Sequence, residues 1–69
     1  MEYKKYLILL CLYDEIRQTR QLDPKKILSK YEINNRQMWS YIKNLKEYFK
    51  NYQNETLVYD PKLKLYYLE

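Results

Sequence analysis

The sequence predicts an α+β domain in which three helices are followed by a two-stranded β-hairpin. Apolar residues return at helical spacing along most of the chain, whereas the final segment alternates with a period of two. A chain of 69 residues has room for one domain. We therefore expect a single domain over residues 1–69, with helices over residues 3–19, 24–32 and 35–52 and a hairpin over residues 56–68.

The first predicted helix holds the longest apolar run of the chain, YLILLCLY at residues 6–13. Helical spacing joins Tyr6, Leu9, Leu10, Tyr13 and Ile16 in one stripe, and the apolar arc is widened by Leu7, Ile8 and Leu12. A helix that is apolar on nearly every side must be covered on more than one side. This predicts a central helix or, as the alternative, one that pairs with a second copy of the chain. The run is too short to cross a bilayer, which needs ~20 residues, and it lacks a cleavage site, so a cytoplasmic protein without membrane contact is expected.

The second predicted helix begins with a clear start signal. Asp23 can cap the helix by accepting a backbone hydrogen bond, and Pro24 fits the first helical position, where its missing N–H costs nothing. Ile27, Leu28 and Tyr31 then form a short stripe that should face the core.

The third predicted helix is capped by Asn34 or Asn35. One side carries the apolar residues Met38, Ile42, Leu45, Phe49 and Tyr52, which we expect in the core. The opposite side carries Arg36, Ser40, Lys43 and Glu47, with Trp39 and Asn44 on its shoulders. The short gap between the second and third helices suits a helix-turn-helix corner.

The hairpin is predicted from two short alternating runs, a strand at residues 56–59 and another at residues 64–68. Asp60 and Pro61 between them favour a turn, because Asp can accept hydrogen bonds from the following residues and Pro presets φ. The order of three helices and a hairpin is that of a winged helix-turn-helix domain.

Composition excludes most kinds of enzyme. The chain has no histidine, no glycine and one cysteine, which argues against catalytic triads, phosphate-binding loops, a metal site or a cofactor. Cys11 lies in the apolar run, where we expect a buried, inert thiol, and the acidic pair Asp14 and Glu15 is interpreted as solvated surface. No enzymatic activity is expected.

The charge is modestly basic, with 13 Lys+Arg against 9 Asp+Glu, a net charge of +4 and a pI near 9.1. Residues 34–53 carry four of the cations and a single acid, Glu47. A basic excess concentrated on one helix favours a polyanionic partner, although evenly solvated lysines are the simpler alternative.

Two segments, INNRQMWSYIKNL at residues 33–45 and VYDPKLKLYYL at residues 58–68, carry a family resemblance. They resemble the winged-helix domains of DeoR-type and WYL-domain transcriptional regulators, whose third helix reads S-x-R-T-I-x-R-D-I-x-x-L after a hydrophobic residue and whose wing reads Y-D…G-Y-x-L. The matching positions are Ile33, Asn34, Arg36, Ile42 and Leu45 in the helix and Tyr59, Asp60, Tyr66, Tyr67 and Leu68 in the wing.

The motif is partly degenerate. Gln37 and Met38 replace the family's threonine and isoleucine, while Ser40 and Tyr41 stand where the family has arginine and aspartate. The wing lacks its glycine, and residues 63–65 fill that region. The resemblance implies a stand-alone DNA-binding domain with no effector domain.

Under a DNA-binding interpretation, the third helix enters the major groove and the wing contacts phosphate. Arg36 suits guanine, Gln37 suits adenine and Lys43 suits phosphate, from their donor and acceptor geometry. The remaining candidate contacts are Asn35, Trp39 and Ser40 on the helix, Lys62 and Lys64 on the wing, and Lys25 and Lys26 at the start of the second helix. The predicted partner is double-stranded DNA, and the predicted role is transcription regulation.

Two alternatives remain open from the sequence. Exposed Trp39 and Tyr41 could instead anchor a protein interface, making the chain an interaction module or an inhibitor of the kind found in phages and mobile elements. Trp39 could also pack against the second helix, and Lys62 and Lys64 could be solvated residues of an edge strand. A homodimer through the first helix is a further possible partner.

Overall fold

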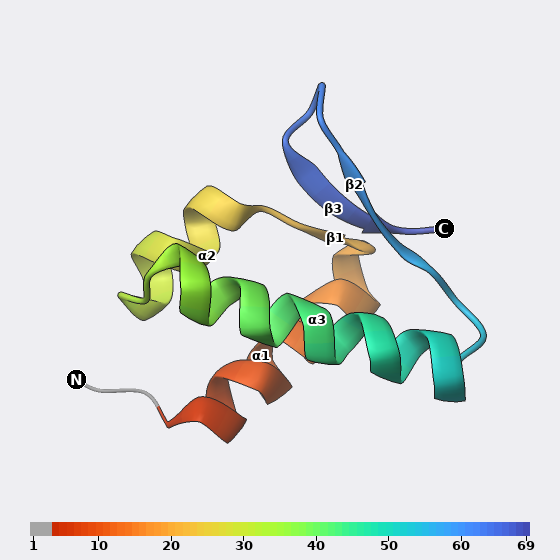
Figure 1. The fold of residues 1–69 in the computed structure, drawn as a ribbon, viewed down its shortest axis with the longest axis horizontal. Coiled ribbons are helices and arrows are strands. Elements are labelled where there is room, and N and C mark those ends of the chain that lie inside the picture. Colours follow the sequence, from red (N-terminus) through yellow and green to blue (C-terminus); the bar gives the residue numbers. More distant parts are fainter. Residues whose placement is uncertain (1–3) are drawn as a thin grey trace.

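Helices occupy most of the N-terminal three quarters of the chain in the computed structural model, which describes residues 4–69 (Figure 1). The elements follow in the order α1 (Lys5–Thr19), β1 (Gln21–Leu22), α2 (Pro24–Tyr31), α3 (Asn35–Tyr52), β2 (Leu57–Asp60) and β3 (Leu65–Leu68). The fold is therefore α+β, with three helices and a three-stranded antiparallel sheet. Residue 3, the expected start of the first helix, lies outside the described residues.

The sheet corrects the prediction of two strands. Its order is β1-β3-β2, so the last strand of the chain lies in the centre and pairs with both neighbours. Pairing joins Leu22 to Tyr66 on one edge of β3 and Leu57 to Leu68 on the other. The sequence pattern did not predict β1, because a strand of two residues is too short to show the alternation of apolar and polar residues that indicates a strand.

Capping side chains explain why α2 and α3 begin where the sequence predicts. The Asp23 carboxylate accepts a hydrogen bond from the Lys25 N–H at 3.0 Å. Asn34 Oδ1 accepts from the Gln37 N–H at 2.8 Å, and Gln37 Oε1 accepts from the Asn34 N–H at 3.1 Å. This reciprocal capping box satisfies two backbone donors that the helix leaves free.

The predicted apolar side of α3 largely forms the core. Met38, Ile42, Leu45 and Phe49 are buried, with Ile27 and Tyr31 of α2 and Leu57, Tyr66 and Leu68 of the sheet. Tyr52 is 77% exposed, so its assignment to the core is wrong. The last turn of α3 extends past the end of α1 (Figure 1), which a helical period alone does not reveal. Tyr41 is buried, so its predicted exposure is also wrong.

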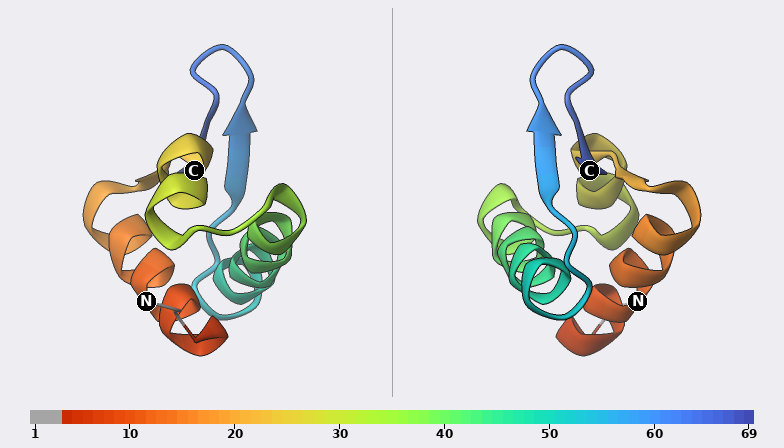
Figure 2. Two further views of the ribbon diagram at one scale, coloured as in Figure 1. Left: turned by 90° about the vertical axis from the view of Figure 1, so that its left-hand side faces the viewer. Right: turned by 90° about the vertical axis from the view of Figure 1, so that its right-hand side faces the viewer.

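Helix α1 contacts the core along one side. Ile8, Leu12 and Ile16 are buried, whereas Tyr6 and Leu10 are 59% and 60% exposed. The predicted stripe through those two exposed residues is therefore wrong, and α1 lies at one edge of the domain instead of at its centre (Figure 2). A helix that is apolar all round does not reveal which side faces the core.

Cys11 also lies on the uncovered part of α1 and is exposed, contrary to the expected buried thiol. Within residues 4–69, none of the helices is long and apolar enough to cross a lipid bilayer.

Four residues take the left-handed conformation without being glycine. They are Arg20, Glu32, Asn54 and Lys64, with φ of 63°, 52°, 53° and 57°. Asparagine tolerates this region, whereas for other residues it costs roughly 1–2 kcal/mol. Arg20 ends α1, donates its backbone N–H to Ile16 and forms a 2.7 Å ion pair with Glu55, which joins the end of α1 to the loop after α3.

Replacing Glu32 by glycine should raise the free energy of unfolding by about 1 kcal/mol, because glycine adopts the left-handed cap of α2 without strain. Urea denaturation measures the change. Ser29→Gly, in the right-handed interior of the same helix, is the matched control and should lower stability by about 0.5–1 kcal/mol. A destabilised Glu32→Gly variant would contradict the account of the cap.

Burial of Tyr66 predicts a loss of stability in alkali. Burial raises the pKa of its phenol from the ordinary value of 10.0, with a smaller contribution from Tyr59. A raised pKa means that the folded state holds the Tyr66 proton more tightly than the unfolded state does. The contribution of this group to the free energy of unfolding is therefore complete below pH 10.0 and is lost as the pH rises through the pKa of Tyr66 in the folded state. Tyr66→Phe should therefore reduce the dependence of the unfolding free energy on pH above 10.0. An unchanged alkaline slope in urea denaturation would contradict this assignment.

Candidate nucleic-acid interface

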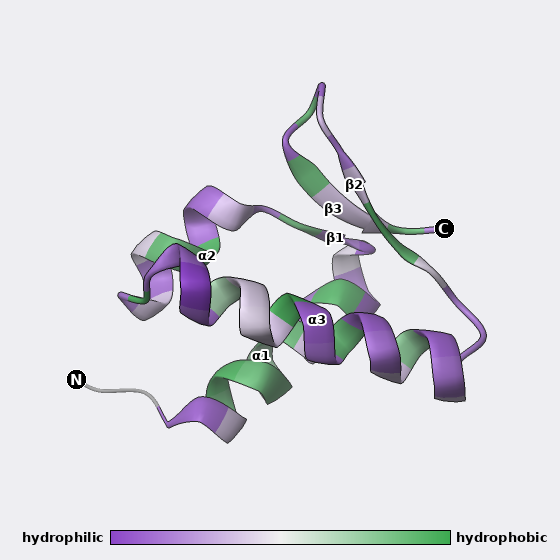
Figure 3. Cartoon of the chain, viewed as in Figure 1, coloured by the Kyte–Doolittle hydropathy of each residue, from purple (hydrophilic) through white to green (hydrophobic). Residues whose placement is uncertain are grey.

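The four cations of α3 lie on one flank of the helix, and its single acid, Glu47, lies at the outer border of that flank. At ~100° per residue, Arg36, Lys43, Lys46 and Lys50 fall within an arc of about 80° that also contains Trp39. We call these five residues the cationic flank. The opposite flank carries uncharged residues, Asn44, Tyr48 and Asn51, and the buried side separates the two. Figure 3 shows hydrophilic residues on the outward turns of α3 and hydrophobic residues gathered on α1.

Lys46 brings the cationic flank toward the hairpin formed by β2 and β3. Lys46 Nζ lies 5.2 Å from the centre of the Trp39 ring and 6.0 Å from that of Tyr66 on β3. The Tyr66 ring in turn contacts Tyr59 of β2, with 4.9 Å between ring centres. Lys46 thus joins α3 to the hairpin, and a cation over an aromatic face contributes about 0.5–1 kcal/mol at such an exposed site.

Trp39 is half exposed, with its ring against Lys46 on the side toward the hairpin. Tyr59 is 42% exposed. Two aromatic side chains with open surface therefore lie among lysines where α3 meets the hairpin. Flat rings flanked by cations suit contacts with sugar, base or phosphate groups.

The remaining candidate residues of α3 lie in its first two turns. Asn35, Arg36, Gln37 and Ser40 are all exposed. Gln37 is the one already engaged, because its Oε1 accepts the capping hydrogen bond from Asn34. A bidentate contact with adenine needs both the acceptor and the donor of the amide, so it would require this capping bond to break.

The lysines of the hairpin lie in a rigid turn. Asp60 Oδ1 accepts from the N–H groups of Lys62 at 2.8 Å and Leu63 at 3.2 Å, and the Asp60 carbonyl accepts from Lys64 at 2.7 Å. Lys62 and Lys64 are exposed. The predicted turn chemistry at Asp60 is confirmed, and it fixes the backbone from which both lysines extend.

Lys25 and Lys26 are exposed in the first turn of α2. Figure 1 places this turn above α3, on the same side of that helix as the hairpin. Three separate segments therefore bring cations toward one side of the molecule: the start of α2, the cationic flank and the hairpin turn.

Sequence reasoning did not include Lys46, Lys50 and Tyr59 among the candidate contacts. The two lysines follow Trp39 by seven and eleven positions and so lie on its side of the helix, a signal that a full helical projection contains. Tyr59 carried no such signal, because its approach to α3 depends on how the sheet packs.

Comparison of the chain with models of protein families, with curated proteins and with solved structures found no match. The arrangement of cations and aromatic side chains around α3 and the hairpin is therefore the physical basis for assigning a function.

Proposed function

We propose that this protein is a small regulator of transcription that binds double-stranded DNA with a winged helix-turn-helix fold. In this proposal α3 enters the major groove and the hairpin serves as the wing, resting on the adjacent backbone. The observation that carries it is the gathering of every cation of α3 on the flank beside the hairpin. The phosphate backbone supplies most of the binding energy in such complexes, so a continuous cationic surface is the first requirement.

The dimensions of the surface suit a duplex. Eighteen residues make α3 ~27 Å long, and the major groove, ~12 Å wide, accepts an α-helix. Lys43, Lys46 and Lys50 follow the helix at intervals of three to four residues, which suits contacts to successive phosphates along one groove edge. Arg36, in the first turn, supplies the planar fork that pairs with guanine.

The degenerate motif limits sequence discrimination in this proposal. Ser40 offers a single hydroxyl where an arginine would offer a charged fork, and the Gln37 acceptor is already used in the helix cap. We therefore expect phosphate contacts to dominate affinity and Arg36 to supply most of the preference for sequence.

A protein-interaction module is the competing function for the same surface. One of its two predicted anchors, Tyr41, is buried, which leaves Trp39 with the Lys46 ammonium over its ring. Interface cores are depleted of lysine, so this neighbour favours a polyanion over a protein partner.

Lys43→Ala and Lys50→Ala should each weaken DNA binding several-fold and reduce the salt dependence by about one released counterion, because each removes a phosphate contact. Fluorescence anisotropy of a labelled random duplex at about 50 and 200 mM salt measures both effects. Lys5→Ala, an exposed lysine at the start of α1, is the matched control and should leave both quantities unchanged. Unaltered affinity in both α3 variants would refute the proposed surface.

Arg36→Ala should relax sequence preference with a smaller effect on binding to random DNA, since a bidentate arginine–guanine contact discriminates by ~1–3 kcal/mol. Selection of preferred sites from a random duplex pool, performed in parallel for both proteins, measures the change. Binding lost equally for every sequence would assign Arg36 to phosphate instead.

A further inference from the structure

A continuous apolar stripe crosses the molecule on the side of α1 that the core leaves uncovered. Tyr6, Leu7 and Leu10 of α1 are 59%, 43% and 60% exposed. From Leu10 the stripe continues by helical spacing to Tyr13, whose ring meets that of Tyr48 on α3 at 5.4 Å. We call this surface the α1 face, and its members are Tyr6, Leu7, Leu10, Tyr13, Tyr48 and Tyr52.

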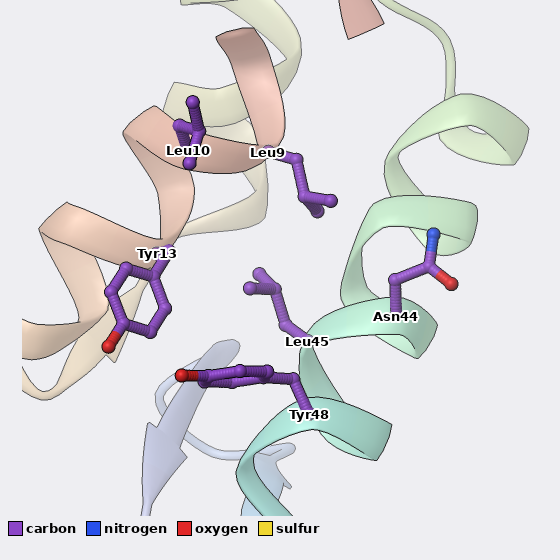
Figure 4. Close-up of a pocket in the computed structure, with 6 residues that line it drawn as sticks. All are labelled: Leu9, Leu10, Tyr13, Asn44, Leu45 and Tyr48. Carbon is purple, nitrogen blue, oxygen red and sulfur yellow. The ribbon is translucent and has the colours of Figure 1, made fainter. Parts of the chain in front are cut away.

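A groove runs along the α1 face between the two helices. Its volume is about 280 Å³, and it is lined by Leu9, Leu10, Tyr13, Asn44, Leu45 and Tyr48. Figure 4 shows the side chains of Leu9, Leu45 and Tyr48 directed into the space between α1 and α3, with the Tyr48 ring pointing toward Tyr13. The hydrogen bond between the Tyr13 and Tyr48 hydroxyls raises the pKa of Tyr13, with smaller contributions from burial and from the Tyr48 charge. The Tyr13 phenol is therefore neutral at physiological pH and adds no charge to the groove.

The exposed area of the α1 face approaches the area that one partner contributes to a small dimer interface. With ~150–250 Å² for each aromatic side chain, the exposed fractions amount to roughly 500–600 Å². A specific interface covers about 600–800 Å² on each partner, near 10% of a small protein's surface, and the whole surface here is 5405 Å². The largest apolar patch of a monomer is about 300–600 Å², so the α1 face lies at the upper limit for a chain without a partner.

The charges around the α1 face indicate how a partner would lie. Among the described residues of α1 and its cap, Lys4 and Lys5 give the start a charge of +2. Asp14 and Glu15 in the third turn and Arg17 in the last turn give the second half a net charge of −1. Two copies of α1 packed antiparallel place the basic end of one beside the acidic turn of the other. A parallel pair would place like charges together, which is destabilising.

We propose that a second copy of this chain covers the α1 face, with the two α1 helices antiparallel about a two-fold axis near Leu10. The interface is isologous, so Leu10 and Tyr6 of each copy enter the groove of the other. Lys4 of one copy lies beside Asp14 of its partner on the same edge of the contact, because both residues are about 6–9 Å from Leu10 along the helix. The cationic flank lies on the other side of α3 and stays uncovered in both copies.

Sedimentation of the full chain without DNA tests the proposal independently of its function. Between ~1 µM and ~1 mM the protein should pass from monomer to dimer, and Leu10→Lys should weaken the dimer about 100-fold, because each dimer would bury two unpaired charges in an apolar contact. Leu63→Lys is the matched control, since Leu63 is equally exposed at 65% but lies in the hairpin turn. Circular dichroism of both variants checks that the monomer fold is kept.

A protein that stays monomeric to ~1 mM, or a dimer that Leu63→Lys disrupts and Leu10→Lys does not, would overturn the proposal. Neither result bears on DNA binding, because no DNA is present.

Charge reversal tests the orientation of the two helices. Lys4→Glu and Asp14→Lys should each weaken the dimer about two- to fivefold, and the double variant should regain the original affinity because the pairs across the two-fold axis are restored with opposite signs. In a parallel pair, like charges stay together in every one of these variants, so the double variant would not recover affinity. A double variant whose dimer is no tighter than the dimers of the single variants would therefore exclude the antiparallel arrangement.

Discussion

Burial of one side of α3 is the constraint on which the rest of the structure depends. Phe49 is fully buried at the C-terminal end of this side, where its ring stacks on Tyr13 of α1 with 5.6 Å between ring centres. Met38, Ile42 and Leu45 continue the contact toward the start of the helix. Once this side is fixed, the position of every other residue on α3 follows from the helical repeat. One flank is therefore cationic and the opposite flank is uncharged.

The elements that sequence predicts best are those with strong local signals. Asp23 with Pro24 and Asn34 with Gln37 define the starts of α2 and α3 through hydrogen bonds between neighbours in the chain, so no knowledge of the tertiary structure is needed. The Asp60 turn is local in the same way. By contrast, β1 forms because Gln21 and Leu22 pair with residues of β3, which lie more than 40 positions later in the sequence. A two-residue segment carries no sequence signal that predicts this pairing.

The same distinction applies to the surfaces. Arg36 and Lys43 of α3 are predicted to face away from the core, since a polar stripe on an amphipathic helix has one stable orientation. The covered side of α1 was predicted wrongly because leucine, isoleucine and tyrosine surround that helix, and only packing decides that Ile8, Leu12 and Ile16 turn inward. The contact of Lys46 with Trp39 and Tyr66 depends on the angle between helix and sheet, which composition does not encode.

The central place of β3 has a consequence for how the protein is made. Strands β1 and β2 do not pair with each other, because each pairs with β3, which follows both of them in the chain. A nascent chain that stops before Leu65 therefore has no sheet, and the backbones around Leu22 and Leu57 remain as open edges. Proteases cleave unpaired and unfolded segments most readily, so a chain truncated before Leu65 should be more susceptible to proteolysis than the full chain.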